Sequence, residues 1–508
     1  MAATTPRLQP RHDSSPQTRR RTAPVQLIGP WQNALEGAAA TLCAVAAMAT
    51  VSALSLALLD AGSLGSLWSL TMALTAMAVG GSASADPEGT AGTGGIGGLA
   101  SLFGGGGGMG PSMSGAADVV PLGVTLVGAV VLWIVFSRRL RQGQQRRFTG
   151  GELIVRAAGA GTAALVTLMI VAGLAHGSVT VPTSAMTGMR GPGADQFTGG
   201  LGDPSGGLED LFGGGSGGLG GLMGGGDRAA QPAMAYQVSV GSAGFGAVLW
   251  VAVVIGAGCL ISRRLRLPLG GALDGLRAAW GPSVSAVVRT ILVLAAVPLV
   301  TLAFIGAVVG GRAGSVAGAA LLLAPNALAV FLTLGVGSPW TAAVHPVQSD
   351  SSGNPMAALM GGMGDSGGMG GSGQPDRTEQ LRSLSASGWP LWLAAVAVTG
   401  LLLLACAYRA ARATHSGHKL PVLPYRGPLS GHLGMAERFG VVTAVVLGAG
   451  AWLVGASGHF GISMFGSEMG GMQAELSGNV LSTVVFGLLV GSLAGFAGSL
   501  LSAVRRAQ

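Results

Sequence analysis

The stretch "SRRLRQGQQRRFTGG" (residues 137–151) separates two long apolar segments and decides how this chain is organised. The apolar segments on its two sides, about 119–137 and 152–175, are each long enough for a helix to cross the roughly 30 Å hydrocarbon core of a bilayer. Arginine and lysine close to the ends of membrane spans stay on the cytoplasmic side. The stretch therefore predicts a short cytoplasmic loop between two transmembrane helices.

The same pattern recurs along the chain. Only 9% of its 508 residues are charged and 49% are hydrophobic, whereas soluble domains carry roughly 25% charged residues. Basic residues cluster around 19–21, 138–147, 263–266, 409–426 and 505–506, and most acidic residues lie between these clusters. This alternation predicts an all-α polytopic protein of a cell membrane, with the lipid bilayer as its partner. The predicted spans are about 35–59, 119–137, 152–175, 240–262, 285–311, 389–408, 438–457 and 479–503.

Two further apolar stretches, 64–80 and 314–338, are long enough to raise an alternative topology. If either of them crossed the bilayer, a following arginine-rich loop would reach the outer face, against the usual placement of positive charge. We therefore expect both to be re-entrant or outer-leaflet segments, with Pro325 and Asn326 as break points in the second. Both chain termini are then predicted to be cytoplasmic.

The loops predicted to lie outside, 81–118, 176–238 and 339–388, are dominated by glycine and serine, and we expect them to be flexible coil. "GGLASLFGGG" (97–106) and "GGLEDLFGGG" (206–215) occupy corresponding places in the first two loops, and "NALEGAAATL" (33–42) is matched by "GALDGLRAAW" (271–280). These matches predict two membrane halves of the same orientation, 34–267 and 268–508, each of two hairpins. We expect a disordered basic segment, 1–33, before them.

An arginine-rich N-terminus, the segment "PWQNALEGAAATL" (30–42), repeated basic loops and glycine-rich outer loops together resemble the streptophobe family. Its members are large hydrophobic membrane proteins of actinobacteria. The resemblance extends over essentially the whole chain. It implies an integral membrane protein without an assigned activity, and it supplies no catalytic or cofactor-binding residues.

Motifs for catalysis are missing from the sequence. Lys419 is the sole lysine and lies in "GHKLP", so there is no phosphate-binding P-loop, and neither a zinc-protease HExxH nor a nucleophile elbow occurs. We expect no enzyme, no cofactor and no nucleic acid partner. Two functions remain open. A permease or channel for an unidentified small solute requires a polar vestibule between the halves beside Asn326, whereas a non-transporting structural or assembly protein requires tight packing there.

Glycines at helical spacing form a second group of candidate residues. Gly487, Gly491 and Gly495 repeat every four residues in the last predicted span, and Gly306 and Gly310 do so near the end of the fifth. Faces of small residues let helices approach closely in lipid. We expect these glycines to lie at helix contacts within the bundle, and a contact in a homo-oligomer is the alternative.

Charged residues near the cytoplasmic ends of spans are few. Glu36 and Asp274 occupy equivalent positions in "ALEG" and "ALDG", where they could bind or gate at a cytoplasmic mouth. The alternative is a first-turn carboxylate that the helix dipole favours. Glu152 and Arg156 are four residues apart and are expected to pair along one helix.

Methionine is concentrated in the outer loops and their margins, where three MxxM pairs occur. Thioethers and imidazoles are ligands that suit Cu(I), and His176, His345 and His459 lie near the same face. The pairs therefore raise the possibility of an outer-face copper site, although adaptable apolar contacts are the preferred interpretation. The candidate ligands are Met186, Met189, Met360, Met363, Met469 and Met472.

Overall fold

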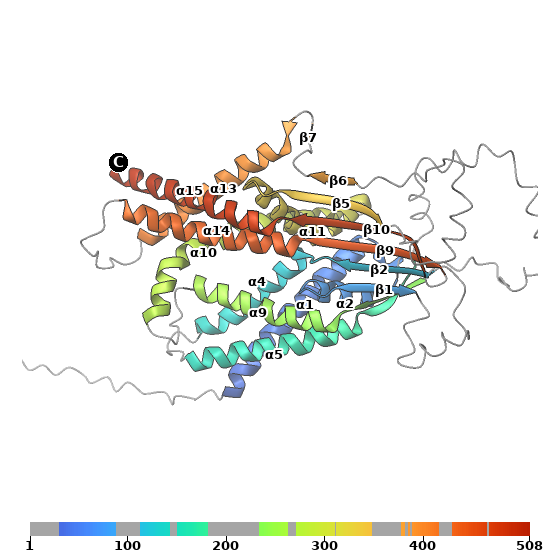
Figure 1. Ribbon diagram of the computed structural model, residues 1–508. Coiled ribbons are helices and arrows are strands. Elements are labelled where there is room, and N and C mark those ends of the chain that lie inside the picture. The colour runs from blue at the N-terminus through green and yellow to red at the C-terminus, as the bar shows by residue number, and fades with distance from the viewer. Residues whose placement is uncertain are drawn as a thin grey trace, which may run out of the picture.

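A computed structural model shows a bundle of helices with a β-sheet at one end (Figure 1). The structure describes residues 30–63, 65–87, 112–142, 150–180, 233–262, 271–309, 311–347, 377–380, 385–386, 389–415, 429–464 and 467–508. The strands lie at one end of the bundle, which we call the strand end. The last turn of the final helix, with Arg505 and Arg506, lies at the opposite end, which we call the basic end.

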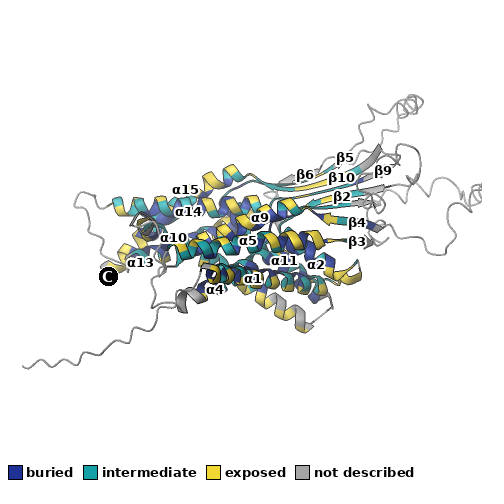
Figure 2. Ribbon diagram, turned by 90° about the horizontal axis from the view of Figure 1, so that it is seen from below, coloured by how far each residue is buried: buried dark blue, intermediate teal, exposed yellow. Residues whose placement is uncertain are grey.

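Eight helices in the described part of the chain are long and apolar enough to cross a membrane, so this is a multi-pass membrane protein. They are α1 (Pro30–Leu58), α5 (Gly150–Leu174), α9 (Val240–Ile261), α10 (Gly271–Val309), α11 (Gly311–Gly335), α13 (Leu391–His415), α14 (Ser430–Val454) and α15 (Val480–Ala507). Figure 2 shows that their exposed residues face outward. Large apolar side chains such as Phe245 and Phe304 are among the exposed ones, as expected for helices that face lipid.

The number eight agrees with the sequence analysis, but the set of helices differs. The segment predicted as the span 119–137 forms α4 (Leu122–Gln142), whose apolar part is the shorter Leu122–Arg138. The segment 314–338, predicted not to cross, forms α11 and is long and apolar enough to do so. The segment 64–80 contains only the 11-residue helix α2 (Leu67–Met77), which is about 16 Å long and too short to cross.

The contacts of α11 locate it within the bundle. Gly318 lies against the last turn of α1, Asn326 against the first residues of α4, and Gly335 against the second turn of α13. Each of these partners is the part of its helix nearest to a strand. From Gly318 onward, α11 therefore lies along the strand end of the bundle. It stays at this end, although its length and composition would allow it to cross the membrane.

The sheet was not foreseen. Sequence analysis treated 81–118, 176–238 and 339–388 as coil throughout, whereas the described margins of these loops pair as antiparallel strands. The eight strands, in spatial order, are β3 (His176–Thr180), β4 (Ala233–Val238), β1 (Ala83–Pro87), β2 (Ser112–Asp118), β9 (Ala456–Met464), β10 (Ser467–Gly478), β5 (Trp340–Val347) and β6 (Arg377–Gln380). A separate pair joins β7 (Ser385–Ala386) and β8 (Trp389–Pro390).

The central contact of the sheet joins the two halves of the chain. Strand β2 pairs with β9 over seven residue pairs, from Ser112 opposite Ser463 to Asp118 opposite Ser457. On each side of this contact the strands come from one half. The described sheet is therefore one continuous antiparallel layer, in which β3 and β6 are the outermost strands.

Two glycines turn the chain from a helix into a strand. Gly80 after α2 and Gly337 after α11 have φ angles of 98° and 100°, a region that residues with a Cβ rarely adopt. Their amides donate to Met77 O and Leu334 O, each at 2.9 Å. These bonds satisfy carbonyls at the helix C-terminus, and β1 and β5 begin three residues later.

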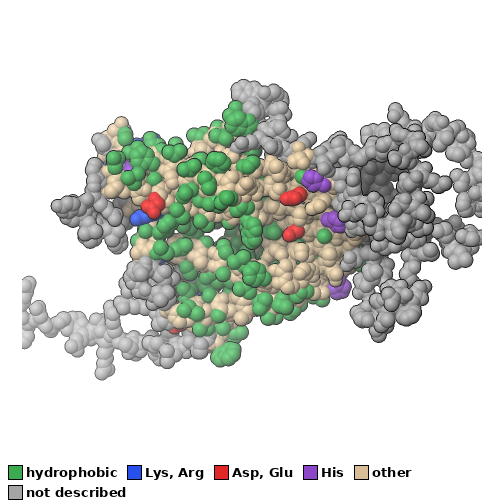
Figure 3. Space-filling view, viewed as in Figure 1, with side chains coloured by type: hydrophobic (Ala, Val, Ile, Leu, Met, Phe, Trp, Pro, Cys, Tyr) green, Lys and Arg blue, Asp and Glu red, His purple; other side chains and the backbone are tan. Residues whose placement is uncertain are grey.

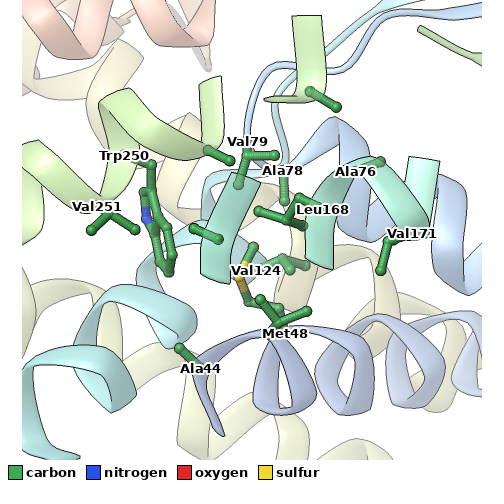
Figure 4. Packing of buried hydrophobic residues seen from close by; sticks show 14 of the residues in the cluster. Ala44, Met48, Ala76, Ala78, Val79, Val124, Leu168, Val171, Trp250 and Val251 are labelled. Carbon is green, nitrogen blue, oxygen red and sulfur yellow. The ribbon is translucent and has the colours of Figure 1, made fainter. Parts of the chain in front are cut away.

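The bundle has separate cores in its two halves. The first contains Met48, Leu168 and Trp250, which converge between α1, α5 and α9 (Figure 4). The second lies among α10, α11, α13 and α14 and includes Phe439. A smaller cluster around Trp340 packs with Leu122 at the junction of the halves. Each half therefore has its own apolar core, and the junction adds a third.

Candidate functional site at the strand end

One face of the sheet is polar. Residues opposite each other on neighbouring strands point to the same face, so the register defines rows of side chains across the sheet. One row, over seven strands, consists of His176, Gln237, Ser84, Ala116, His459, Gln473 and His345. Figure 3 shows histidine side chains in a line over the strands. We call the surface that contains this row the polar face.

A second row of the polar face lies nearer to the helices. Asp118, Ser457 and Glu475 occupy successive strands in it, and all three are exposed. Acidic side chains are visible beside the line of histidines in Figure 3. Lysine and arginine do not occur in either row. The polar face thus offers carboxylates, imidazoles and amides to whatever contacts it.

The opposite face of the sheet is apolar. Ala83 and Val238 pack against the core of the first half, and so does Tyr236. Burial raises the pKa of the Tyr236 phenol, and the neighbouring Ser69 hydroxyl offsets part of this rise. The phenol is therefore neutral at physiological pH, and it helps to seat the sheet on the helices.

A groove with a volume of about 620 Å³ lies beside β3, and we call it the α2 groove. One wall is formed by Ser63, at the end of η1 (Ala61–Ser63), together with Ser66 and Trp68, and the other by Leu174 and His176. The indole of Trp68 is 64% exposed. None of the described residues that line the groove carries a formal charge, so its chemistry suits neutral groups that form hydrogen bonds and apolar contacts.

His176 has a defined hydrogen bond at the rim of this groove. Its Nδ1 lies 3.0 Å from Gly173 O. Because a carbonyl oxygen can only accept, Nδ1 carries the proton in this bond, and the neutral ring then has Nε2 as an acceptor. In its neutral form the histidine therefore presents an acceptor, beside the hydroxyls of the serines.

Asn326 joins the two halves of the protein. Its Oδ1 accepts from Leu122 N at 2.9 Å, and its Nδ2 donates to Val120 O at 2.7 Å. The side chain is 8% exposed. A Cβ on Gly123 would collide with Leu321 O, so backbone lies against backbone beside this amide. At Asn326 the halves are closely packed, and the residue binds the first turn of α4 rather than lining a passage.

A second cavity lies inside the second half. It has a volume of about 30 Å³ and is lined in part by Thr290, Thr399 and Thr443. A buried water needs at least about 10–15 Å³, so the cavity could hold one or two waters and no larger solute. The buried Thr399 hydroxyl has no hydrogen-bond partner among the described residues.

The basic end contains a partly buried ion pair that the sequence analysis did not predict. Arg156 Nη2 lies 3.3 Å from Glu36 Oε2, and the arginine side chain is 3% exposed. Its guanidinium also lies 4.8 Å from the centre of the Phe136 ring. Glu36 was interpreted as a gating or first-turn carboxylate. The first-turn interpretation is wrong, because α1 begins at Pro30, and the ion pair links α1 to α5.

The glycines of the last helix lie against α14. A Cβ on Gly491 would be 2.8 Å from Thr443 Cβ, and one on Gly495 would be 3.0 Å from Ala436 Cα. Gly487 lies against the same helix, with 3.2 Å from its ideal Cβ to the Cα of Ala444. These three residues therefore let the axes of α14 and α15 come close together.

Other candidates are only partly placed. Met472 is 36% exposed and lies opposite Phe460 and Pro346. His345 and His459 both lie opposite Gln473, and successive strand residues point to opposite faces. Met472 and these histidines therefore lie on opposite faces of the sheet. The structure does not describe Gly310, Met186, Met189, Met360 and Met363, or the side-chain surroundings of Gly306, Met469 and Asp274.

The described side chains form no metal-binding cluster of the usual kind. Within the described ranges, no three side chains of His, Cys, Asp or Glu lie together as a metal site requires. No protein family, curated protein or solved structure matches the chain. Its function is therefore argued from the geometry of the strand end and of the junction between the halves.

Proposed function

We propose that this multi-pass membrane protein is a non-transporting structural protein, which holds the sheet at the outer surface of the membrane. The observation that carries the proposal is the closed contact at Asn326, where both ends of the side-chain amide bind the main chain of the other half. A conduit between the halves would need polar, solvent-filled space at this place. Close packing is what a structural protein requires.

The proposed orientation follows from charge and from the sheet. Arg505 and Arg506 end α15 at the basic end, and such residues favour the cytoplasmic side. Exposed Asp118 and Glu475 on the polar face favour water. With α2 and α11 remaining at the strand end and α4 crossing in place of α11, eight helices cross, and both termini are cytoplasmic. The polar face is then displayed outside the cell.

We also propose that the halves are internal repeats of the same orientation. The strand order supports this, because β3-β4-β1-β2 is followed by its counterpart β9-β10-β5-β6 in the same sense. Gly80 and Gly337 make the same turn before β1 and β5. Equivalent backbone bonds also join Ser239 N to Ser82 O at 3.0 Å and Asn479 N to Pro339 O at 3.3 Å.

Solute flux tests the proposal. Purified protein is reconstituted into liposomes. Osmotic swelling is then measured with neutral solutes of increasing size, up to disaccharides. We expect rates equal to those of protein-free vesicles, because the junction at Asn326 and the 30 Å³ cavity leave no room for a solute. A control with a known channel shows that the vesicles report flux. Saturable swelling with the parent protein, abolished in Asn326→Ala, would overturn the proposal.

A further inference from the structure

The sheet has two outermost strands whose counterparts pair with each other inside the chain. In the repeat proposed above, β3 corresponds to β9 and β6 corresponds to β2. The internal pair β2–β9 extends over seven residue pairs. Edge strands carry unpaired backbone donors and acceptors, and they are templates for further pairing. The outer edge of β6 thus corresponds to the edge of β2, and the outer edge of β3 corresponds to the edge of β9. The edges of β2 and β9 already pair with each other within the chain.

We infer that a second copy of this chain docks on β3 and the α2 groove, with its β6 adding to β3 as β2 adds to β9. The inference rests on the proposed repeat. Both halves have the same orientation, so the second copy enters the same bilayer in the same orientation. The contact is head-to-tail, because it joins two different surfaces.

The end of α5 shows what is uncovered at this surface. Helices α5 and α14 each contain 25 residues and end at Leu174 and Val454. Val454 is 3% exposed, and it belongs to the cluster on which Leu122 of the first half packs. Leu174 is 47% exposed and lines the α2 groove. The end of α14 is thus covered at the junction of the halves, whereas Leu174 at the end of α5 is left exposed in the groove.

A residue of α2 in the floor of the groove can be compared with a residue of α11 in the same way. Ser69 and Asn326 each lie eleven residues before the glycine that ends their helix, Gly80 or Gly337. Asn326 binds the chain where it enters α4. Ser69 lines the open groove instead. Both comparisons identify the groove as the unfilled counterpart of the junction between the halves.

The sequence of the second half contains a segment that corresponds to the one bound by Asn326. Val120–Leu122 reads Val-Pro-Leu before α4, and Trp389–Leu391 reads Trp-Pro-Leu before α13. The first segment begins two residues after β2. The second begins nine residues after β6, and its first two residues form β8, which pairs with β7. When β6 of a second copy pairs with β3, this segment reaches the α2 groove. An indole and a neutral main chain suit a groove of about 620 Å³ without charged walls.

Pairs of cysteines test the predicted register. Ala116 lies opposite Ser84, the second residue of β1, and Gln380 lies opposite Thr341, the second residue of β5. His459 lies opposite Gln473, which is five residues before the end of β10. Thr180 lies opposite Ala233, which is five residues before the end of β4. Because Ala116 pairs with His459, Gln380 is predicted to lie opposite Thr180 of the next copy.

In the experiment, Gln380→Cys and Thr180→Cys are placed on two differently tagged chains, in which Cys43, Cys259 and Cys406 are replaced by alanine. We expect a disulfide between the two tagged chains in native membranes. The control, Ala116→Cys with His459→Cys in one chain, should form an internal disulfide and shows that the sheet is folded. An internal disulfide without the one between chains overturns the inference but leaves the fold intact. When both cysteines are placed on one chain instead, a Gln380–Thr180 disulfide that forms only within that chain overturns it as well.

A blocked groove gives a second measurement. Ser66→Arg introduces a bulky cation into the α2 groove, whereas Gln473→Arg adds the same charge on an interior strand of the polar face. We expect self-association in lipid nanodiscs to weaken about tenfold or more in Ser66→Arg, which is about 1.4 kcal/mol, and to be unchanged in Gln473→Arg. A parent protein that is monomeric at all concentrations, or a Ser66→Arg variant that associates as the parent does, overturns the inference.

Discussion

Single residues explain how the halves are held together. Asn326 satisfies a partly buried amide and a partly buried carbonyl where the chain enters α4, and a side chain at Gly123 would separate the two backbones. A hydrogen bond contributes little net stability, but a buried group left without its partner costs about 1–3 kcal/mol. The importance of Asn326 therefore lies in what its loss would leave unpaired.

Asn326→Ala should lower the stability of the folded protein by about 1–3 kcal/mol or more, because Leu122 N and Val120 O both lose their partner. Thermal unfolding in detergent measures the change. Asn479→Ala is the matched control, since this amide only caps the exposed start of α15. The cap is worth about 1 kcal/mol. An equal or smaller loss for Asn326→Ala would contradict the role of this residue.

Helix pairs are the next scale, and α14–α15 shows how sequence spacing becomes packing. Gly487, Gly491 and Gly495 were predicted from their spacing alone to lie at a helix contact, and they lie within ordinary contact distance of α14 or closer. In lipid, helices associate through close packing and not through burial of apolar surface from water. A bulky side chain in this row must therefore separate the pair.

Gly491→Leu should push α15 away from α14 and destabilise the bundle by a few kcal/mol, which is the range for overpacking a core. Gly400→Leu on α13 is the control, because a Cβ at Gly400 meets nothing within 4 Å. The melting temperature of both variants in the same detergent provides the comparison. If Gly491→Leu melts with the parent, the close contact is not important for stability.

At the scale of the whole molecule, the strands gather at one end and the final arginines lie at the other (Figure 1). Pairing of β2 with β9 ties the halves together at the strand end, and Asn326 does so directly beneath it. The arrangement makes the proposed orientation testable with two exposed positions at opposite ends.

Ser457→Cys, on the polar face, should react with a membrane-impermeant thiol reagent in intact cells. Gln508→Cys, at the basic end, should react only after the cells are permeabilised. Both residues are exposed, and both variants are made in the cysteine-free background. Labelling of Gln508→Cys in intact cells would contradict the proposed topology, because it would place the C-terminus outside the cell.

Local features of the sequence sufficed for the helices. The predicted spans 152–175 and 240–262 match α5 and α9 almost to their ends, because a helix in lipid satisfies its backbone bonds within its own segment. The spacing of Gly487, Gly491 and Gly495 likewise predicted a packed face, since residues four apart share one side of a helix. Both are properties of one continuous stretch of chain.

The sheet and the junction were decided only by the tertiary structure. "SMSGAAD" (112–118) and "ASGHFGISM" (456–464) are rich in small residues and flank glycine-rich loops, so neither carries a clear strand pattern. They become strands because each satisfies the backbone bonds of the other, far away in the chain. In the same way, Asn326 was predicted as a break in a helix, and only the packing of α11 on α4 reveals it as the bond between the halves. Contacts between distant segments depend on which surfaces meet in space, and a local pattern does not contain that information.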